Sequence, residues 1–152
     1  MTGLGFSEDK SDAAQIRAHL EACDASFIPR LSDRIDLVGY AGKLADRARR
    51  FEAWENGELV GLVAAYCNAP DCRKAFITSV SVLSQTRGRG LASQLMERCI
   101  MAVKDAGFDR LELEVGIGNE GAKTLYGKHG FRLTSEGRGM AVMTLELDGM
   151  ER

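Results

Sequence analysis

Two different spacings of apolar residues divide the chain. In its first third they recur every three to four residues, and Ile16 and Leu20 predict a helix that begins after Ser11-Asp12, either of which can cap it. A second helix is predicted over Asp36–Arg50. The segment 23–36 between the two is predicted to be irregular. The apolar side of the second helix consists of Leu37, Tyr40, Ala41, Leu44 and Ala48.

From residue 51 onward the pattern is that of extended strands. Residues 51–55 and 58–66 flank Asn56-Gly57, a dipeptide that tolerates the positive φ of a two-residue type I′ hairpin turn. After a turn-rich loop over 68–74, a third strand is predicted over Ala75–Leu83, which is rich in β-branched and apolar residues. This region therefore predicts an antiparallel hairpin followed by a further strand.

The second half of the chain alternates helices and strands. A helix with one broad apolar stripe is predicted to begin at Leu91, and Gly107 stands at its C-terminal cap. The order of the predicted elements indicates one mixed α/β sheet with helices covering its faces. The remaining predicted elements are a strand over Leu111–Val115, a helix over Glu120–His129 and two strands over Phe131–Ser135 and Met140–Leu147.

Length and charge predict one globular domain. The chain has 152 residues, with 20 Lys and Arg against 22 Asp and Glu, for a net charge of −2. We expect a single domain over residues 1–152, large enough to bury a core without a disulfide or a metal. The balanced charge predicts no nucleic-acid partner, because domains that bind nucleic acid are usually strongly basic. A local phosphate-binding site is compatible with this balanced total charge.

The cysteines and the N-terminal residues predict the cellular compartment of the protein. Residues 1–9 show no basic region followed by an apolar run, and no stretch approaches the roughly 18 apolar residues of a membrane span. Cys67 and Cys72 have no second pair beside them, so no metal site is predicted. These residues, with Cys23 and Cys99, are expected to be reduced thiols. The sequence predicts a cytoplasmic protein without a membrane partner, and a homodimer is one form it could take.

A glycine-rich turn, Gln85-Thr86-Arg87-Gly88-Arg89-Gly90, joins the third strand to the next helix. Glycines let the backbone bend close to an anion, and the first N–H groups of a helix have no internal partners. Arg87 and Arg89 add two guanidinium groups that can bind phosphate. The alternative is a tight turn with two solvated arginines. Two nucleotide motifs fit poorly, because no Gly-Lys-Ser/Thr occurs and Ser93 stands where a dinucleotide fingerprint needs Gly or Ala.

Two motifs together resemble a known family. Gln85-x-x-Gly88-x-Gly90 matches the Q/R-x-x-G-x-G/A signature of the GCN5-related N-acetyltransferases, the GNAT superfamily. Asn119–Phe131 matches the N-x-x-A-x-x-L-Y-x-x-x-G-F segment of that family at every defined position. The resemblance is close over 75–131, and the order of elements fits from about Ser11 to the end. It implies an α/β (α+β) fold with a mixed, mostly antiparallel central sheet flanked by helices.

The resemblance also implies acetyl-CoA, or a related acyl-CoA, as acyl donor. The turn Arg87–Ala92 would bind the pyrophosphate through backbone N–H groups, and Asn119 would contact the pantetheine amide. The pantetheine arm would pair with Val80-Ser81-Val82 as an added strand, and a backbone N–H near Val82 would polarise the thioester carbonyl. The positions assigned in this way to the donor are Val80, Ser81, Val82, Arg87, Gly88, Arg89, Gly90, Leu91, Ala92, Asn119 and Tyr126.

Tyr126 and Glu114 are the predicted catalytic residues. By resemblance Tyr126 lies beside the sulfur of CoA, and a phenol with a pKa of about 10 can protonate a thiolate with a pKa of about 8.5. The alternative is a half-buried aromatic that only packs. Glu112 and Glu114 share one face of their strand, and Glu114 precedes Tyr126 by the spacing of the ribosomal-protein N-terminal acetyltransferases, where that Glu is the base. A different base or a water chain is the alternative, and a serine at 79 or 81 could position such a water.

Other polar residues are expected to be structural. His19 is predicted on the exposed side of the first helix, and His129 ends a helix, where a cation complements the dipole. Cys99 lies on a buried stripe without a nearby His in the sequence, so it is not predicted to be a nucleophile.

The acceptor site is predicted from the resemblance at about 25–40 and 136–138. Charges of both signs occur there and leave its chemistry open: Asp33, Asp36 and Glu136 against Arg30, Arg34 and Arg138. The predicted function is transfer of an acetyl group to a primary amine of a small metabolite, an amino sugar or an amino acid. The alternatives are N-terminal acetylation of a protein and a non-catalytic acyl-CoA-binding module.

Overall fold

The computed structural model describes residues 3–27, 30–68 and 73–147. Seven strands form one sheet in the order β1-β2-β3-β4-β5-β7-β6. The strands are Leu4–Glu8 (β1), Arg49–Glu55 (β2), Glu58–Tyr66 (β3), Lys74–Val82 (β4), Arg110–Gly116 (β5), Arg132–Gly137 (β6) and Met140–Glu146 (β7). The helices are Ala13–Cys23 (α1), Leu37–Arg47 (α2), Leu91–Asp105 (α3) and Glu120–Lys128 (α4), with short 3₁₀ turns at Asp24–Ser26, Leu31–Asp33 and Ser84–Thr86.

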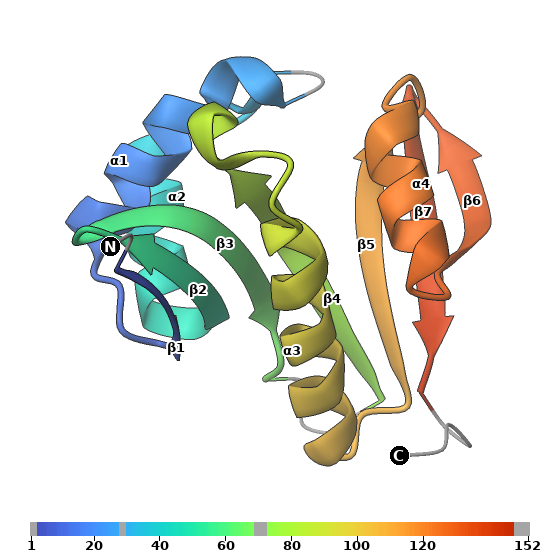
Figure 1. The fold of residues 1–152 in the computed structure, drawn as a ribbon. Coiled ribbons are helices and arrows are strands. Elements are labelled where there is room, and N and C mark those ends of the chain that lie inside the picture. Colours follow the sequence, from blue (N-terminus) through green and yellow to red (C-terminus); the bar gives the residue numbers. More distant parts are fainter. Residues whose placement is uncertain (1–2, 28–29, 69–72, 148–152) are drawn as a thin grey trace.

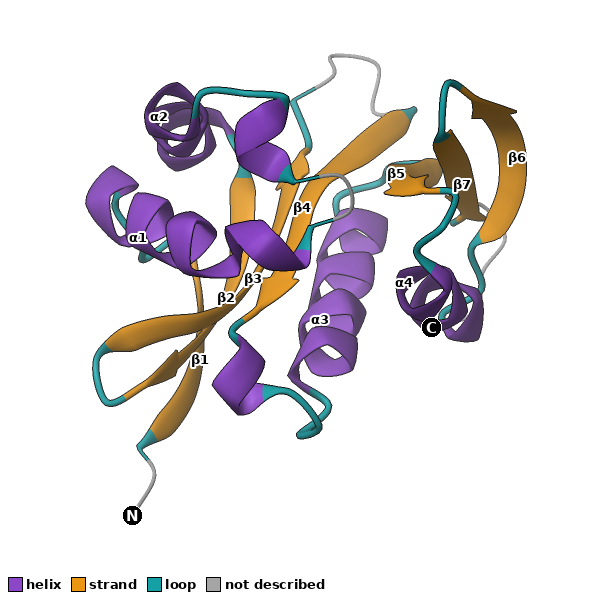
Figure 2. Ribbon diagram, turned by 90° about the horizontal axis from the view of Figure 1, so that it is seen from above, coloured by secondary structure: helices purple, strands orange, loops and turns teal. Residues whose placement is uncertain are grey.

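The helices cover both faces of the sheet. Helices α1 and α2 lie on one face, and α3 and α4 lie on the other (Figure 2). On the first face Ile16, Leu20 and Leu44 share a core cluster with Leu62 and Ala64 of β3. The larger cluster on the second face is built from the apolar stripe of α3 together with Phe51, Val63, Leu111 and Leu113. The fold class expected from the sequence is confirmed.

One pair of neighbouring strands differs from all the others. Strands β4 and β5 are parallel, whereas every other neighbouring pair is antiparallel. Their pairing extends only from Lys74 opposite Arg110 to Ile77 opposite Leu113. Beyond these residues the two strands diverge, and they divide the sheet into a β1–β4 half and a β5–β7–β6 half (Figure 1). The divergence leaves the later residues of β4 without a neighbouring strand on that side.

A β-bulge in β4 changes which side chains face α1 and α2. Ala65 pairs with Ile77 but Ala64 pairs with Ser79, so Thr78 is an extra residue. Paired residues share a face of the sheet, and Ala64 belongs to the α1 and α2 side. Ser79 therefore faces that side, as does Thr78, whose hydroxyl lies 2.5 Å from that of Tyr40 in α2. The bulge places two consecutive polar side chains on the same face.

Several local predictions are confirmed. Asp12 caps α1 by accepting from Gln15 N, and the Gln15 side chain accepts from Asp12 N in return. Asn56 and Gly57 have φ of 53° and 80°, as a type I′ turn requires. Gly107, with φ of 92°, follows the end of α3.

Two predictions about the first half of the chain are wrong. The N-terminal strand β1 was not predicted, because Leu-Gly-Phe-Ser-Glu has neither a β-branched run nor a strong alternation, and the strand forms by pairing with β2 at the edge of the sheet. Helix α2 ends at Arg47 rather than Arg50, because Arg49 and Arg50 already pair with β3. The loop predicted over 68–74 falls largely outside the described residues.

The described part of the chain holds no helix long and apolar enough to cross a membrane. Cys23, Cys67 and Cys99 are free thiols, as expected, and Cys72 lies outside the described residues. Within 3–27, 30–68 and 73–147, no three His, Cys, Asp or Glu side chains gather closely enough to hold a metal ion.

A buried carboxylate joins the N-terminal segment to β2. Glu52 is fully buried, and it accepts hydrogen bonds from Ser7 Oγ at 2.7 Å, from Lys10 N at 2.9 Å and from the backbone and hydroxyl of Ser11. Burial by itself would raise the pKa of this carboxyl, but the hydrogen bonds from Ser11, Lys10 and Ser7 outweigh it and lower the pKa. Glu52 is therefore ionised, and it pairs with the buried Arg50 at 3.4 Å.

Arg50 extends this network to the end of α2. Its guanidinium donates to the carbonyl and hydroxyl oxygens of Ser11 on one side. On the other side it donates to the carbonyls of Leu44, Ala45 and Ala48, each at 3.1 Å. These carbonyls lie at the end of α2, where backbone oxygens lack some or all of their helical partners; Leu44 O also accepts from Ala48 N of the C-cap. The Arg50–Glu52 pair thus positions both helices that cover the first face.

Replacing Glu52 with Ala should lower the free energy of unfolding by about 3–5 kcal/mol, because Arg50 would stay buried without its counter-charge. Urea unfolding at pH 7 measures the change. The matched control is Glu58→Ala, an exposed glutamate in the same hairpin, which should change stability by less than about 0.5 kcal/mol. Equal effects of the two substitutions would show that the buried pair does not stabilise the fold.

Candidate active site

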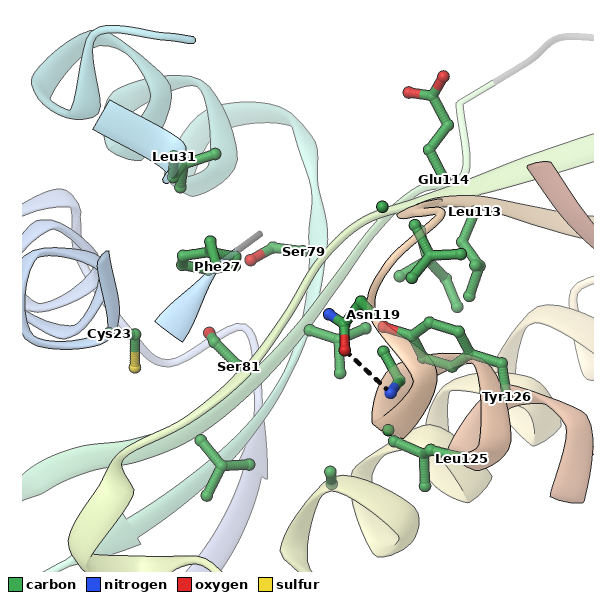
Figure 3. Close-up of a pocket in the computed structure, with 18 of the residues that line it drawn as sticks. Cys23, Phe27, Leu31, Ser79, Ser81, Leu113, Glu114, Asn119, Leu125 and Tyr126 are labelled. Carbon is green, nitrogen blue, oxygen red and sulfur yellow. Dashed lines mark hydrogen bonds between the residues drawn. The ribbon is translucent and has the colours of Figure 1, made fainter. Parts of the chain in front are cut away.

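A cavity of about 560 Å³ lies where β4 and β5 diverge. Its walls come from β4, β5, the glycine-rich turn, the first turns of α4 and the segment after α1 (Figure 3). The cavity therefore collects residues from both sequence motifs in one place. Among the residues that line it are Val80, Ser81, Val82, Arg87, Gly88, Gly90, Leu91, Ala92, Glu114, Asn119 and Tyr126.

The glycine-rich turn closes one end of the cavity. Gly88 and Gly90 have φ of 87° and 72°, a left-handed conformation that disfavours other residues, and Gly90 is the N-cap of α3. The first backbone N–H groups of α3 have no partner within the helix, and a helix N-terminus that borders a cavity is suited to bind an anion. Only one of its two arginines lines the cavity. That residue is Arg87, whereas the Arg89 guanidinium is bound by Glu55 at 2.7 Å.

The edge of β4 forms the middle of the cavity. Val80, Ser81 and Val82 pair with β3 on one side, but the pairing of β4 with β5 ends at Ile77. A strand has backbone N–H and C=O groups on both edges, and those on the β5 side of this stretch have no neighbouring strand. They are suited to bind an extended ligand by main-chain hydrogen bonds.

Tyr126 and Asn119 project from α4 toward this edge of β4 (Figure 3). Tyr126 is 7% exposed and packs against Phe131, and burial raises the pKa of its hydroxyl to about 12. It is therefore protonated at neutral pH and can act as a proton donor. The Asn119 side-chain oxygen accepts from Ala122 N at 3.2 Å and so caps α4, which orients its amide group in the cavity wall.

Glu114 lies at the rim of the cavity. Glu112 and Glu114 share the face of β5 opposite to Leu113 and Val115, which belong to the core. The Glu112 carboxylate pairs with Lys74 at 3.4 Å, whereas the exposed Glu114 makes no ion pair with a described residue. In Figure 3 its carboxylate points away from Tyr126. The two predicted catalytic residues thus line the same cavity but face its opposite sides.

His19 is buried, contrary to the prediction. Its Nδ1 lies 2.8 Å from the carbonyl of Leu59, which can only accept, so Nδ1 carries a proton. Burial lowers the pKa of the imidazole, so the ring is neutral and Nε2 accepts from Ser81 Oγ at 2.8 Å. The sequence held a signal for this burial. His19 lies three residues after Ile16 and four before Cys23, on the same stripe of α1 that packs against the sheet.

Two buried cysteines are poorly suited to act as nucleophiles. Cys23 lines the cavity, with its Sγ 3.7 Å from His19 Nε2, but burial raises the pKa of its thiol to about 11. The thiol is therefore not the thiolate that a nucleophile requires. Cys99 is fully buried, and burial raises the pKa of its thiol further.

His129 follows the last residue of α4, and its Nε2 lies 2.9 Å from Ser93 Oγ.

The segment after α1 reaches the cavity, and the last hairpin hardly does. Phe27, Leu31 and Arg34 line the cavity, as the prediction over 25–40 implied. From the last hairpin only Met140 does so, and the predicted residues 136–138 do not. They form the end of β6 and the turn after it, beyond the part of β7 that touches the cavity. Of the two segments predicted to form the acceptor site, the first borders the cavity and the second does not, and the acceptor site itself stays a prediction.

Comparison with known proteins establishes the family. The model of the Acetyltransferase (GNAT) family matches residues 13–131. The chain belongs to this family, as its two motifs predicted. Among curated relatives, the N-alpha-acetyltransferase MAK3 of Arabidopsis thaliana is 38% identical over 84 residues, which are 53% of this chain and 43% of that protein. N-acetyltransferase 8 of Rattus norvegicus is 36% identical over 97 residues, which are 61% of this chain and 44% of that protein. The chain thus spans less than half of the length of these two relatives.

Solved structures of similar proteins share the fold. The protein yncA of Salmonella typhimurium, solved with its cofactor acetyl-CoA, has a TM-score of 0.76 at 19% identity and covers 99% of this chain and 97% of its own. The PaiA N-acetyltransferase of Thermoplasma acidophilum, in complex with coenzyme A, has a TM-score of 0.71 at 12% identity and covers 93% and 99%. At these identities the likeness shows that the fold is the same.

The burial of neutral His19 predicts a pH dependence of stability. The unfolded chain protonates this histidine below a pH of about 6.5, whereas the folded protein resists protonation. The free energy of unfolding should therefore fall from pH 6.5 to 5.5, by at most about 1.4 kcal/mol from this group. Urea unfolding at pH 7.5, 6.5 and 5.5 measures the slope.

The variant His19→Asn should flatten this slope, whatever its stability at pH 7.5. The control is His129→Asn, because these two are the only histidines of the chain, and it should keep the slope of the wild type. A slope that is unchanged in His19→Asn would contradict the neutral state assigned to His19.

Proposed function

We propose that this protein is an N-acetyltransferase that transfers the acetyl group of acetyl-CoA to a primary amine of a small metabolite. The observation that carries the proposal is the convergence of both family motifs on one cavity. The glycine-rich turn, the unpaired edge of β4 and Tyr126 line it in succession. A pyrophosphate, an extended arm and a thioester sulfur would meet these three features in the same order. The cytoplasmic location and a homodimeric state stay predictions.

The residues present fit the acyl donor. The backbone of Arg87–Ala92 and the Arg87 side chain would bind the pyrophosphate. The edge of β4 at Val80–Val82 would pair with the pantetheine arm, and the Asn119 amide would bond its amide group. For Arg89, only the backbone N–H takes part, because Glu55 already binds its guanidinium.

The proposed acetyl transfer depends on which residue donates a proton and which accepts one. The amine nitrogen would attack the thioester carbonyl carbon, and a backbone N–H near Val82 would stabilise the negative oxygen that forms. The C–S bond then breaks, and Tyr126 would donate its hydroxyl proton to the departing thiolate. The acceptor binds as an ammonium ion, so its nitrogen must lose one proton before the attack and a second when the amide forms. Glu114 would accept the first through water, because its carboxylate faces away from Tyr126. The second would return through water to the Tyr126 phenolate.

Acetyl-CoA should raise the melting temperature of the protein by roughly 5–10 °C at about 100 times Kd, and ATP or NAD should not. The variant Gly88→Ala should lose most of this rise, because a residue with a Cβ disfavours the φ of 87° that shapes the turn. Differential scanning calorimetry measures both effects.

Gly139→Ala is the matched control. Gly139 has φ of 79°, and, as at Gly88, a Cβ placed there would meet no atom within 4 Å. This variant carries the same kind of backbone strain in the β6–β7 turn, outside the cavity, and should keep the full rise. A full rise in Gly88→Ala as well would exclude the turn as the donor site.

Tyr126→Phe should lower kcat at least tenfold and leave the Kd for acetyl-CoA nearly unchanged, because it removes only the proton donor. Release of free CoA thiol measures kcat, and calorimetric titration measures Kd. Tyr66→Phe, which removes a buried hydroxyl on β3 outside the cavity, should have no effect on kcat. Undiminished kcat in Tyr126→Phe would reduce Tyr126 to a packing role. A wild-type protein that binds acetyl-CoA without acetylating any amine would instead be a binding module.

A further inference from the structure

The cavity extends beyond the proposed donor region to the α1 and α2 side of the sheet. Here its lining includes Phe27, Leu31 and Arg34 from the segment after α1, Ser79 from the bulge of β4 and Glu114 from β5. Leu31 belongs to the core cluster on this side, and Glu114 lies on the face of β5 opposite to Leu113, which is the same side of the sheet. In Figure 3 Ser79 points from β4 toward Phe27. Tyr126 lies on the other side of the sheet from this part of the cavity.

Two opposite charges border this part of the cavity. Among the described residues, three charged side chains line the cavity, and one of them, Arg87, belongs to the glycine-rich turn. The other two are Arg34 and Glu114, and neither makes an ion pair with a described residue. By contrast, a nearby residue of the same charge on each segment is already paired: Arg30 binds Asp24, and Glu112 binds Lys74. This part of the cavity thus has one cation and one anion that are available to a ligand.

A buried hydroxyl between them also has no partner. Ser79 is 5% exposed, and its Oγ meets the geometry of a hydrogen bond with no described residue, although it lies close to the Tyr40 hydroxyl. In Figure 3 it points toward Phe27, into the space on the α1 side. A buried polar group without a partner costs free energy, and a ligand or a water in this space would remove that cost. The Ser79 hydroxyl is therefore available to a polar group that enters this space.

The chemistry of these groups selects among amines. A primary amine is mostly an ammonium ion in solution, which the Glu114 carboxylate attracts. The planar guanidinium of Arg34 matches a carboxylate with two parallel hydrogen bonds. An unphosphorylated amino sugar such as D-glucosamine has no anion for Arg34, and a peptide N-terminus has an amide group where a free amino acid has its carboxylate. Phe27 and Leu31 provide an apolar wall beside these charges.

We propose that the acceptor is a free amino acid with an apolar side chain, whose carboxylate is bound by Arg34 and whose amine lies between Glu114 and Ser79. The inference rests on the proposed acetyltransferase function and narrows its acceptor. Arg34 is then a specificity-determining residue that recognises the carboxylate and takes no part in proton transfer. The apolar side chain packs against Phe27 and Leu31.

The test compares acids with their amides. L-Leucine and L-phenylalanine are assayed with acetyl-CoA against L-leucinamide, L-phenylalaninamide and D-glucosamine, and kcat/KM is measured from the release of CoA thiol. The wild type should prefer each acid over its amide by about ten- to hundredfold, as expected for a charged hydrogen bond. Arg34→Gln should abolish this preference by slowing the acids alone, and Arg34→Lys should restore part of it.

Arg30→Gln is the matched control, because Arg30 lies on the same segment but pairs with Asp24 and does not line the cavity. It should keep the preference for acids. Amides that react as well as acids, or an Arg34→Gln variant that slows both equally, would overturn the carboxylate assignment. Turnover of D-glucosamine alone would also overturn it. If acetyl-CoA raises the melting temperature but neither amino acid reacts, the inference fails while the donor site stands. No rise and no turnover would overturn the proposed function itself.

Discussion

The short parallel pairing of β4 and β5 is the constraint on which the rest of the site depends. A strand inside a sheet normally bonds both neighbours, because unpaired backbone groups that are buried cost free energy. Here the pairing stops at Ile77 and Leu113, and the groups beyond it face a cavity. The second core cluster, on the α3 and α4 side, joins both halves of the sheet and holds them at this separation. The protein therefore keeps a strand edge ready for a ligand inside its own sheet.

The bulge at Thr78 gives the two sides of the divergence different chemistry. Val80 and Val82 turn toward the α3 and α4 side, where they pack against the core, while Ser79 and Ser81 turn toward α1 and α2. On that side Ser81 is bound by His19, and Ser79 has no hydrogen-bond partner among the described residues. One face of β4 thus suits the proposed donor, and the other suits an acceptor. The Arg50–Glu52 pair contributes to this arrangement, because it positions both helices that cover the α1 and α2 side.

Most of the predicted elements and both motifs are present in the structure, because they depend on neighbours close in sequence. A turn such as Asn56-Gly57 or a capped helix such as Glu120–Lys128 forms from local preferences. The failures have one cause. Strand β1 exists because β2 pairs with it, and His19 is buried because Leu59 and Ser81 supply hydrogen bonds from distant strands. A polar residue is buried where other segments supply hydrogen-bond partners. The local sequence pattern shows only part of what decides this, because those partners lie on distant strands.

The amino-acid sequence by itself determined the family, the order of the elements after β1, and the residues of the turn and of α4 that line the cavity. These follow from short motifs whose glycines, caps and apolar stripes act within a few residues of each other. Only the tertiary structure decided which charges are available to a ligand. Sequence alone does not distinguish Arg30 from Arg34, or Arg87 from Arg89. In the folded chain Asp24 pairs with Arg30 and Glu55 pairs with Arg89. Charge pairing between distant segments is a property of the folded chain, and it leaves Arg34, Arg87 and Glu114 to face the cavity.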